Sequence, residues 1–548
     1  MIWLALLVST FFVIVTATAL KPAHRGPLSV LAFTVGWPGG ELAGATLFAQ
    51  SAWLAFMLWW GVPTGWIRTT WFVEVTFVVL GSLILMGSWW LARRTTHRSM
   101  KSSGPFPLNL DDVKPMNFTR WWRSLVILPF RSRDIHVVRN VKYGPDVRNR
   151  LDLMSTTRSG THRPVLFYIH GGAWIYGDKR EQARPMMFEF ARRGYLVVAI
   201  NYRLSPRHRW PAQIEDARLA LAWVKRTIAA YGGDPDRIVV AGGSAGGHLA
   251  ALLSLIGESD QWRPAGEIGQ TDLSVRGCIS LYGVLDMTAD TDAWRGHERG
   301  LKVLLEQTVM GHSLAKHTEV FRLASPRERI AADAPPFLLL QGRSDTLVDY
   351  QVARSFAGRY RELLGDDAPL WHVELPLTQH AYDLSHSPRT TATVAAAVAF
   401  ADWAVSTDRP EANESDVPPH LVAAYQSPPA LLHVEHEDVR ITATQLAERR
   451  GSFFVVTPCN PIGHSTSTSQ NENLVHQFRT ELDDRHWEWL PSEGADPSSD
   501  QWNEPGAAIF GITDEQARRL ARRWRQYAYY EVTAHGAAVR SAIDGRVI

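Results

Sequence analysis

The chain has 548 residues, of which 45% are hydrophobic and 20% are charged, and this length predicts two or three folded units. A formal net charge of +2 argues against a nucleic-acid-binding protein that depends on a strongly basic surface. The only cysteines are Cys278 and Cys459, which excludes a disulfide framework and a zinc site built from cysteines. We therefore expect no nucleic-acid partner, no cofactor and no metal ion.

Residues 1–100 are predicted to be a transmembrane region of about three helices. Apolar segments of membrane-spanning length lie at residues 1–20, 42–62 and 71–92. Together these segments contain a single charged side chain, that of Glu74, as the hydrocarbon core of a bilayer requires. The apolar segment 28–37 is shorter and is followed by Pro38, so we interpret it as a half-helix or as part of a kinked helix.

Basic residues near the ends of these segments predict the orientation. Lys21 and Arg25 follow the first segment, and Arg68 alone lies between the second and the third. The residues that follow the third segment are Arg93, Arg94, Arg98 and Lys101. With three crossings, the positive-inside bias places the rest of the chain on the cytoplasmic side of the plasma membrane. A separate short span at 28–37, or cleavage of the first segment, would reverse this orientation.

Residues 101–133 are predicted to be a juxtamembrane linker, because prolines interrupt a mixed aromatic and basic sequence. In residues 134–405, apolar strand-like runs alternate with helical patterns, which predicts an α/β domain with a mainly parallel sheet and helices on both faces. The expected strands lie at residues 164–169, 195–200, 238–241, 278–281, 337–341 and 372–375. Ligands of such sheets bind beyond the carboxyl ends of the strands.

The strongest chemical signal is the motif G-x-S-x-G, which reads Gly242, Gly243, Ser244, Ala245, Gly246. It follows an apolar β-branched run and precedes an apolar helical pattern, as a nucleophile on a strand-to-helix turn requires. Small neighbours tolerate the strained turn that would expose Ser244, and the dipole of the next helix would stabilise negative charge there. The alternative is a purely structural glycine-serine corner.

A serine nucleophile needs a base, and the base needs an acid that orients it. When the serine lies in a G-x-S-x-G turn, the expected order along the chain is serine, then Asp or Glu, then His. Both partners should therefore follow the serine, each in a loop after a strand. Asp345 and His380 occupy such loops and are the predicted acid and base. Asp349, His372 and His386 compete with them. Asp349 falls in the opening turn of a helix, His372 lies within a strand and His386 lies beyond the turn, so we prefer the first pair.

A pair of glycines after the strand at 164–169 completes the candidate site. Gly171 and Gly172 would let backbone N–H groups approach the oxyanion of a tetrahedral intermediate. With the N–H of Ala245 they form the predicted oxyanion hole. A glycine loop needed only for chain reversal is the alternative, and the presence of Ser244 argues against it.

Further motifs accompany these residues: HGGAW at 170–174, YRLSP at 202–206 and GGDPDRI at 232–238. In this combination residues 134–404 resemble the hormone-sensitive-lipase-like branch of the α/β-hydrolase esterases. The resemblance implies an α/β-hydrolase fold and an acyl-enzyme mechanism in which Ser244, Asp345 and His380 are catalytic. The loop reads HGGA where many members read HGGG, which puts a third backbone donor in question. We interpret Asp216, where the family keeps an acid, as a structural residue that holds the YRLSP turn.

We therefore expect a membrane-anchored serine esterase or lipase that hydrolyses apolar or lipid-like carboxylic esters. An acyltransferase that uses the same catalytic residues is one alternative, and a non-catalytic membrane scaffold is another. The insertion at residues 287–324 is rich in charged and bulky side chains. It is interpreted either as a lid over the strand ends or as an ordinary crossover.

The end of the chain is predicted to contain a polar linker at 406–430 and a small α+β domain at 431–548. A strand is expected at 452–456 and a helix at 513–527, with Thr513 as its cap. Residues 431–531 resemble a small bacterial domain family of unknown function, which implies no chemistry and no particular protein partner. The polar turn within CNPIGHSTSTSQNEN is either a binding loop or a solvated one.

Overall fold

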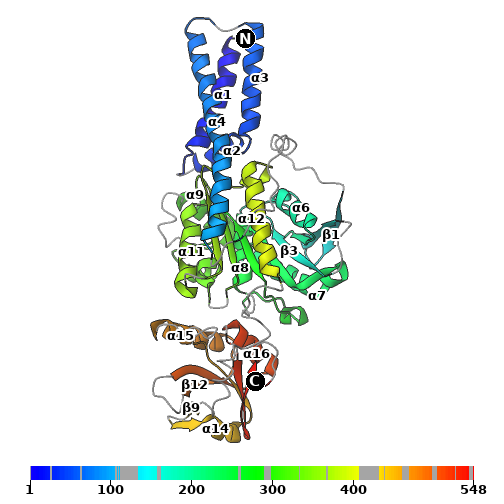
Figure 1. Ribbon diagram of the computed structural model, residues 1–548, viewed down its shortest axis with the longest axis vertical. Coiled ribbons are helices and arrows are strands. Elements are labelled where there is room, and N and C mark those ends of the chain that lie inside the picture. The colour runs from blue at the N-terminus through cyan, green and yellow to red at the C-terminus, as the bar shows by residue number, and fades with distance from the viewer. Residues whose placement is uncertain are drawn as a thin grey trace. The chain divides into compact units, whose positions relative to one another are not determined.

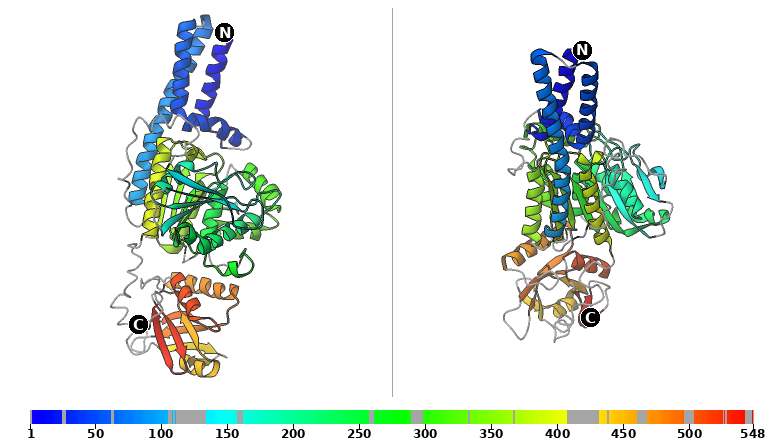
Figure 2. Two further views of the ribbon diagram at one scale, coloured as in Figure 1. Left: turned by 90° about the vertical axis from the view of Figure 1, so that its right-hand side faces the viewer. Right: turned by 45° about the horizontal axis from the view of Figure 1, so that its top comes forward.

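Four apolar helices open the chain in the computed structural model (Figure 1): α1 (Ile2–Leu20), α2 (Leu28–Glu41), α3 (Ala43–Trp60) and α4 (Gly65–Ser102). Helices α1 and α4 are each long and apolar enough to cross a membrane, and α2 with α3 would make a third span if the bent pair is counted as one. The axes of α2 and α3 differ by 78°, so α2 lies across the end of the bundle (Figure 2).

The break between α2 and α3 lies after Glu41, whereas the sequence suggested a break at Pro38, which stays inside α2. Close packing explains the glycine that directly follows this proline. A Cβ atom on Gly39 would lie 2.7 Å from the carbonyl oxygen of Val15 in α1, so only glycine lets α2 lie directly against α1.

The structure describes the chain outside the following positions: 1, 25–27, 62–63, 105–107, 109, 111–133, 157–161, 257–260, 289–297, 332–333, 366–367, 407–430, 437–438, 460–467, 496–502, 525, 527, 542–546 and 548. The described chain divides into two units, residues 1–330 with 334–407 and residues 331–333 with 408–548. Most of the two predicted linkers and the polar turn at 460–467 therefore lie outside the described residues.

The α/β part of the first unit is built on an eight-stranded sheet with the order β1-β2-β4-β3-β5-β6-β7-β8. Its strands are β1 (Ile135–Lys142), β2 (Arg150–Thr156), β3 (Arg163–Ile169), β4 (Leu196–Ile200), β5 (Gly233–Gly243), β6 (Gly277–Leu281), β7 (Phe337–Gly342) and β8 (Leu370–Leu375). Strand β2 pairs antiparallel with β1 and β4, and the strands from β4 to β8 in this order pair in parallel. The predicted α/β-hydrolase fold is thus confirmed, including its six predicted strands.

Helices cover both faces of this sheet. The described helices are α6 (Arg184–Arg192), α7 (Ala212–Thr227), α8 (Ala245–Leu255), α9 (Glu298–Val303), α10 (Thr318–Leu323), α11 (Tyr350–Leu364) and α12 (Pro388–Val405). One apolar core joins the sheet to α7, α8 and α11, and a second core joins the other face to α6 and α12. The second core also contains Ala92 and Met100 of α4.

Helix α4 connects the apolar N-terminal helices to the α/β part. With 38 residues it is about 57 Å long, which is nearly twice the thickness of a hydrocarbon core of about 30 Å. Its C-terminal end is held by the α/β part, because Arg361 donates to the carbonyl of Ser103 at 2.9 Å and the backbone N–H of His372 donates to the Ser103 hydroxyl at 3.1 Å. The predicted span at 71–92 is therefore one part of a longer helix.

The second unit contains a seven-stranded antiparallel sheet with the order β10-β9-β12-β13-β11-β14-β15. Its strands are β9 (Leu431–His436), β10 (Val439–Thr442), β11 (Phe453–Val456), β12 (Trp489–Ala495), β13 (Asn503–Ile509), β14 (Ala528–Thr533) and β15 (Gly536–Ser541). Its helices are α14 (Ala443–Arg450), α15 (Thr468–Asp484) and α16 (Asp514–Arg523). Thr513 caps α16 as predicted, since the N–H of Gln516 donates to its hydroxyl at 3.3 Å. The α+β class of this part is confirmed.

Candidate active site

Ser244 occupies a sharp turn between β5 and α8. Its backbone has φ 56° and ψ −122°, a left-handed conformation that non-glycine residues rarely adopt. A Cβ atom on Gly242 would lie 2.2 Å from the carbonyl oxygen of Gly246, and one on Gly246 would lie 2.1 Å from that of Ile169. Both glycines of the motif are thus required by the close approach of the backbone, and the turn has the strand-to-helix geometry that the motif predicts.

Asp345 and His380 meet beyond the ends of β7 and β8. Their Oδ2 and Nδ1 atoms are 2.7 Å apart, and the two residues are 1% and 4% exposed. An ionised carboxylate only accepts hydrogen bonds, so this contact favours the tautomer of the imidazole with its proton on Nδ1 over the tautomer with its proton on Nε2. The carboxylate also accepts the N–H groups of Leu347 and Val348, each at 2.9 Å, and these bonds fix its orientation.

The competing candidates have other roles or positions. Asp349 caps α11, because its carboxylate accepts the N–H of Gln351 at 2.8 Å. His372 lies inside β8, where burial lowers its pKa to about 4. His386 lies before α12, beyond the turn that carries His380.

The oxyanion loop lies against the nucleophile. A Cβ atom on Gly171 would lie 3.2 Å from the Cβ of Ser244 and 2.6 Å from the carbonyl oxygen of Gly243. The N–H of Gly171, however, donates to the side-chain oxygen of Gln182 at 2.7 Å. Gly171 therefore permits close packing, and its N–H is engaged by Gln182 in this structure. Gly172, with φ 114°, and Ala245 at the start of α8 remain as the candidate donors.

Sequence reasoning missed the aromatic and acidic groups around His380. The ring of Tyr282 lies with its centroid 4.6 Å from that of His380, and its hydroxyl donates to the buried carboxylate of Asp383. Burial raises the pKa of Asp383. Phe33, from α2, presents an edge to the imidazole with centroids 6.0 Å apart. The only signal for Tyr282 was its place directly after the strand 278–281, and no local signal pointed to Phe33.

Other polar groups near the strand ends support the loops. Burial lowers the pKa values of His170 and His248 to about 4 each, so both imidazoles are neutral. The His170 ring stacks on Tyr202 with centroids 4.4 Å apart. Asp216 accepts both the backbone N–H and the Nε of Arg203 at 2.8 Å. It therefore holds the YRLSP turn, as its structural interpretation predicts.

The described part of the 287–324 insertion packs on the loop that follows β4. Residues 304–310 form a π-helix, and the N–H of Trp210 donates to the carbonyl of Val309 at 2.9 Å. Residues 289–297 lie outside the description. The insertion thus borders the carboxyl end of the sheet, where either a lid or a crossover would lie.

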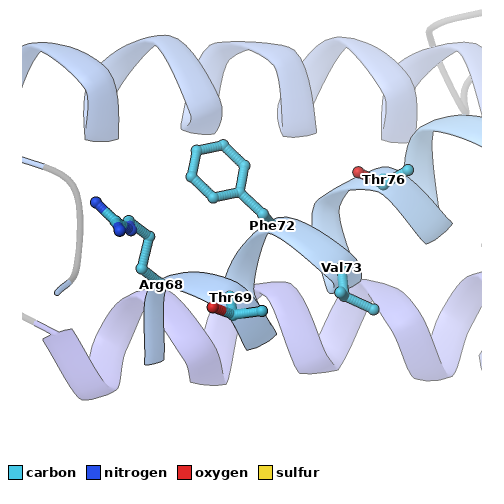
Figure 3. A pocket seen from close by; sticks show the side chains of 5 residues that line it. All are labelled: Arg68, Thr69, Phe72, Val73 and Thr76. Carbon is cyan, nitrogen blue, oxygen red and sulfur yellow. The ribbon is translucent and has the colours of Figure 1, made fainter. Parts of the chain in front are cut away.

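A surface pocket elsewhere carries none of the candidate catalytic groups. It is lined by Arg68, Thr69, Phe72, Val73 and Thr76, which all project from the first half of α4 (Figure 3). Within the part of the chain that the structure describes, no cluster of three or more His, Cys, Asp or Glu side chains could hold a metal ion.

Comparison with known proteins supports both predicted resemblances. Residues 151–360 match the family model described as BD-FAE, and residues 456–529 match the one described as a protein of unknown function, DUF3293. The probable carboxylic ester hydrolase LipM of Mycobacterium tuberculosis is 45% identical over 253 residues, which cover 46% of this chain and 56% of that protein.

Two further relatives match the same part of the chain. Esterase LipQ of Mycobacterium tuberculosis is 39% identical over 254 residues, or 46% of this chain and 58% of that protein. The isoprenylcysteine alpha-carbonyl methylesterase ICME of Arabidopsis thaliana is 31% identical over 223 residues, or 40% and 51% of the two chains. The matched region thus spans little more than half the length of these relatives.

Proposed function

We propose that this protein is a membrane-anchored serine carboxylesterase that hydrolyses apolar or lipid-like esters through an acyl-enzyme. The observation that carries the proposal is the 2.7 Å hydrogen bond between His380 and Asp345, at the same end of the sheet as the strained turn of Ser244. An imidazole held in this tautomer has a free Nε2 to accept a proton from a serine hydroxyl.

The proposed reaction has two halves. The Nε2 of His380 takes the proton of the Ser244 hydroxyl while Oγ attacks the ester carbonyl carbon, and the N–H groups of Gly172 and Ala245 donate to the resulting oxyanion. The intermediate then collapses, the C–O bond to the alcohol breaks, and His380 returns the proton to the leaving alkoxide. A water molecule repeats these steps on the acyl-enzyme, releases the carboxylic acid and restores the serine.

The apolar substrate class is supported by the surroundings of the proposed base. Tyr282 and Phe33 flank His380, and the helix that carries Phe33 belongs to the apolar N-terminal region. Esters with a hydrocarbon chain would keep such side chains away from water, whereas small polar esters would not.

The choice between hydrolysis and acyl transfer can be tested on the purified full-length protein in detergent. We expect p-nitrophenyl esters to yield mainly free carboxylic acid, even when a competing alcohol is present, because water resolves the acyl-enzyme of a hydrolase. The measurement is the ratio of acid to new ester by mass spectrometry. Predominant ester formation would replace the hydrolase with an acyltransferase that uses the same residues.

We also propose that the catalytic part lies on the cytoplasmic side of the plasma membrane. This orientation rests on the basic residues after α1 and in the second half of α4, compared with Arg68 alone at the opposite end, and on the count of α2 with α3 as one span. A reporter that is active only after export, fused behind Ile548, is expected to stay inactive. A strongly active exported reporter, together with an inactive cytoplasmic one, would reverse the proposed topology.

A further inference from the structure

Helix α2 has two different faces. The residues on one face are buried, including Ala32, Gly36 and Trp37. The opposite face is apolar and exposed, with Leu28, Val30 and Leu31 between 54% and 58% exposed. Monomeric soluble proteins rarely leave such a contiguous apolar face in water.

The inner face of α2 touches the loops that carry the candidate acid and base. The hydroxyl of Thr346, next to Asp345, donates to the carbonyl of Ser29 at 2.9 Å. The indole N–H of Trp37 donates to the carbonyl of Ala381 at 2.9 Å, one residue after His380. With Phe33 against the imidazole, this helix forms one wall of the candidate active site.

The end of α2 is fixed to the α/β part by a buried ion pair. Glu41 and Arg389 are both fully buried and bonded to each other, and Arg389 also donates to the hydroxyl of Ser88 in α4 at 2.8 Å. The indole of Trp89 in α4 donates to the carbonyl of Gly40 at 3.0 Å. Breaking a buried pair leaves an uncompensated charge, so α2 is held in place and is not a loose strap.

Helix α2 itself is joined to the candidate membrane spans. Gly39 packs directly against α1, and α3 follows after a bend of 78°. A helix that turns sharply from a span and exposes an apolar face fits the interfacial layer of a bilayer, where such faces are buried among the headgroups and upper acyl chains.

We propose that α2 lies in the membrane surface and that its inner face lines the path by which the hydrocarbon chain of a bilayer-resident ester reaches Ser244. The occupant of the exposed face is the lipid bilayer, and Phe33 is a specificity-determining residue beside the catalytic base. The statement about substrate entry rests on the proposed esterase function, whereas the statement about membrane contact does not.

The membrane contact can be measured with a spin label on Leu31→Cys in the full-length protein, reconstituted in phosphatidylcholine vesicles. Both native cysteines are buried, so the introduced thiol is the accessible one. We expect the label to collide more with oxygen, which partitions into the bilayer, than with a water-soluble nickel complex. A label on Val147→Cys, at a residue that is 79% exposed in the α/β part, is the control and should show the opposite order.

Two results would overturn the membrane contact. Collisions with nickel that exceed those with oxygen at position 31 would place this face in water. Low collision rates with both reagents would mean that protein covers it, from a second copy or another partner.

The role of Phe33 can be tested with p-nitrophenyl esters of short and long acyl chains. Phe33→Ala is expected to lower kcat/KM for the long-chain ester by about tenfold more than for the acetate, because an apolar contact to the chain is lost. Phe33→Leu should recover most of the kcat/KM for the long-chain ester that Phe33→Ala loses. Phe48→Ala, at a residue of α3 that is 62% exposed, should leave the ratio unchanged.

Equal losses on both esters in Phe33→Ala would show that Phe33 only supports the fold, and would overturn its role in specificity. If no variant or parent protein hydrolysed any ester, the proposed function itself would fail, and the spin-label result would still decide the position of α2.

Discussion

Replacement of Ser244 by alanine is expected to lower kcat for a short-chain p-nitrophenyl ester by about five to six orders of magnitude. The reason is that the proposed nucleophile is removed, and the remaining acceleration would come from oxyanion stabilisation and binding alone. The fold should survive, because alanine adds no atom to the tight turn between Gly242 and Gly246. The measurement is single-turnover and steady-state hydrolysis, with thermal unfolding in the same detergent.

Ser274→Ala is the matched control for this substitution. Ser274 is an exposed serine whose hydroxyl bonds Asp272 at 2.9 Å in a surface turn, and its replacement should leave kcat unchanged. Retention of more than a small fraction of turnover in Ser244→Ala would mean that Ser244 is not the nucleophile.

Asp345→Asn is expected to lower kcat by about ten-thousandfold while the shape of the side chain is retained. The asparagine oxygen can still accept the N–H groups of Leu347 and Val348, so its NH2 group would face Nδ1 of His380. An imidazole that accepts at Nδ1 carries its proton on Nε2, where it can no longer act as a base. The measurement is the pH profile of kcat in the variant and the parent.

Asp349→Asn is the paired control, four residues along the chain. Asp349 caps α11, and asparagine is an equally good cap, so both stability and turnover should change little. If Asp349→Asn abolished activity and Asp345→Asn did not, the two roles would have to be exchanged.

Much of the α/β part could be predicted because local patterns determine it. Buried parallel strands are continuous apolar runs, which is why β3 to β8 were recognised within a few residues of their ends. Strand β1 was missed, because it is the antiparallel edge strand of the sheet, where most of its residues are exposed and form no apolar run. The antiparallel sheet of the second unit was largely missed for a related reason, since polar residues, proline and glycine interrupt strands such as β12 and β13.

In the candidate site, too, some residues could be predicted from local patterns and others could not. Ser244, Asp345 and His380 follow recognisable strands, and their order along the chain predicted that they would converge. The hydrogen bond that occupies the N–H of Gly171 could not be predicted, because Gln182 reaches the loop from eleven residues away. Phe33 and Trp37 lie more than three hundred residues from the loop that they contact. Only a folded chain brings the apolar N-terminal region to His380.

The central claim, that Ser244 is an activated nucleophile, is tested most directly by covalent labelling of the full-length protein with a fluorophosphonate probe. A serine with an oriented base attacks the phosphorus and keeps the adduct, whereas ordinary serines do not react at a comparable rate. We expect one adduct per chain, on the peptide that contains Ser244, and its loss in both Ser244→Ala and His380→Ala. An unlabelled Ser244 in detergent and in vesicles, with native thermal stability, would contradict the account and favour a non-catalytic membrane protein.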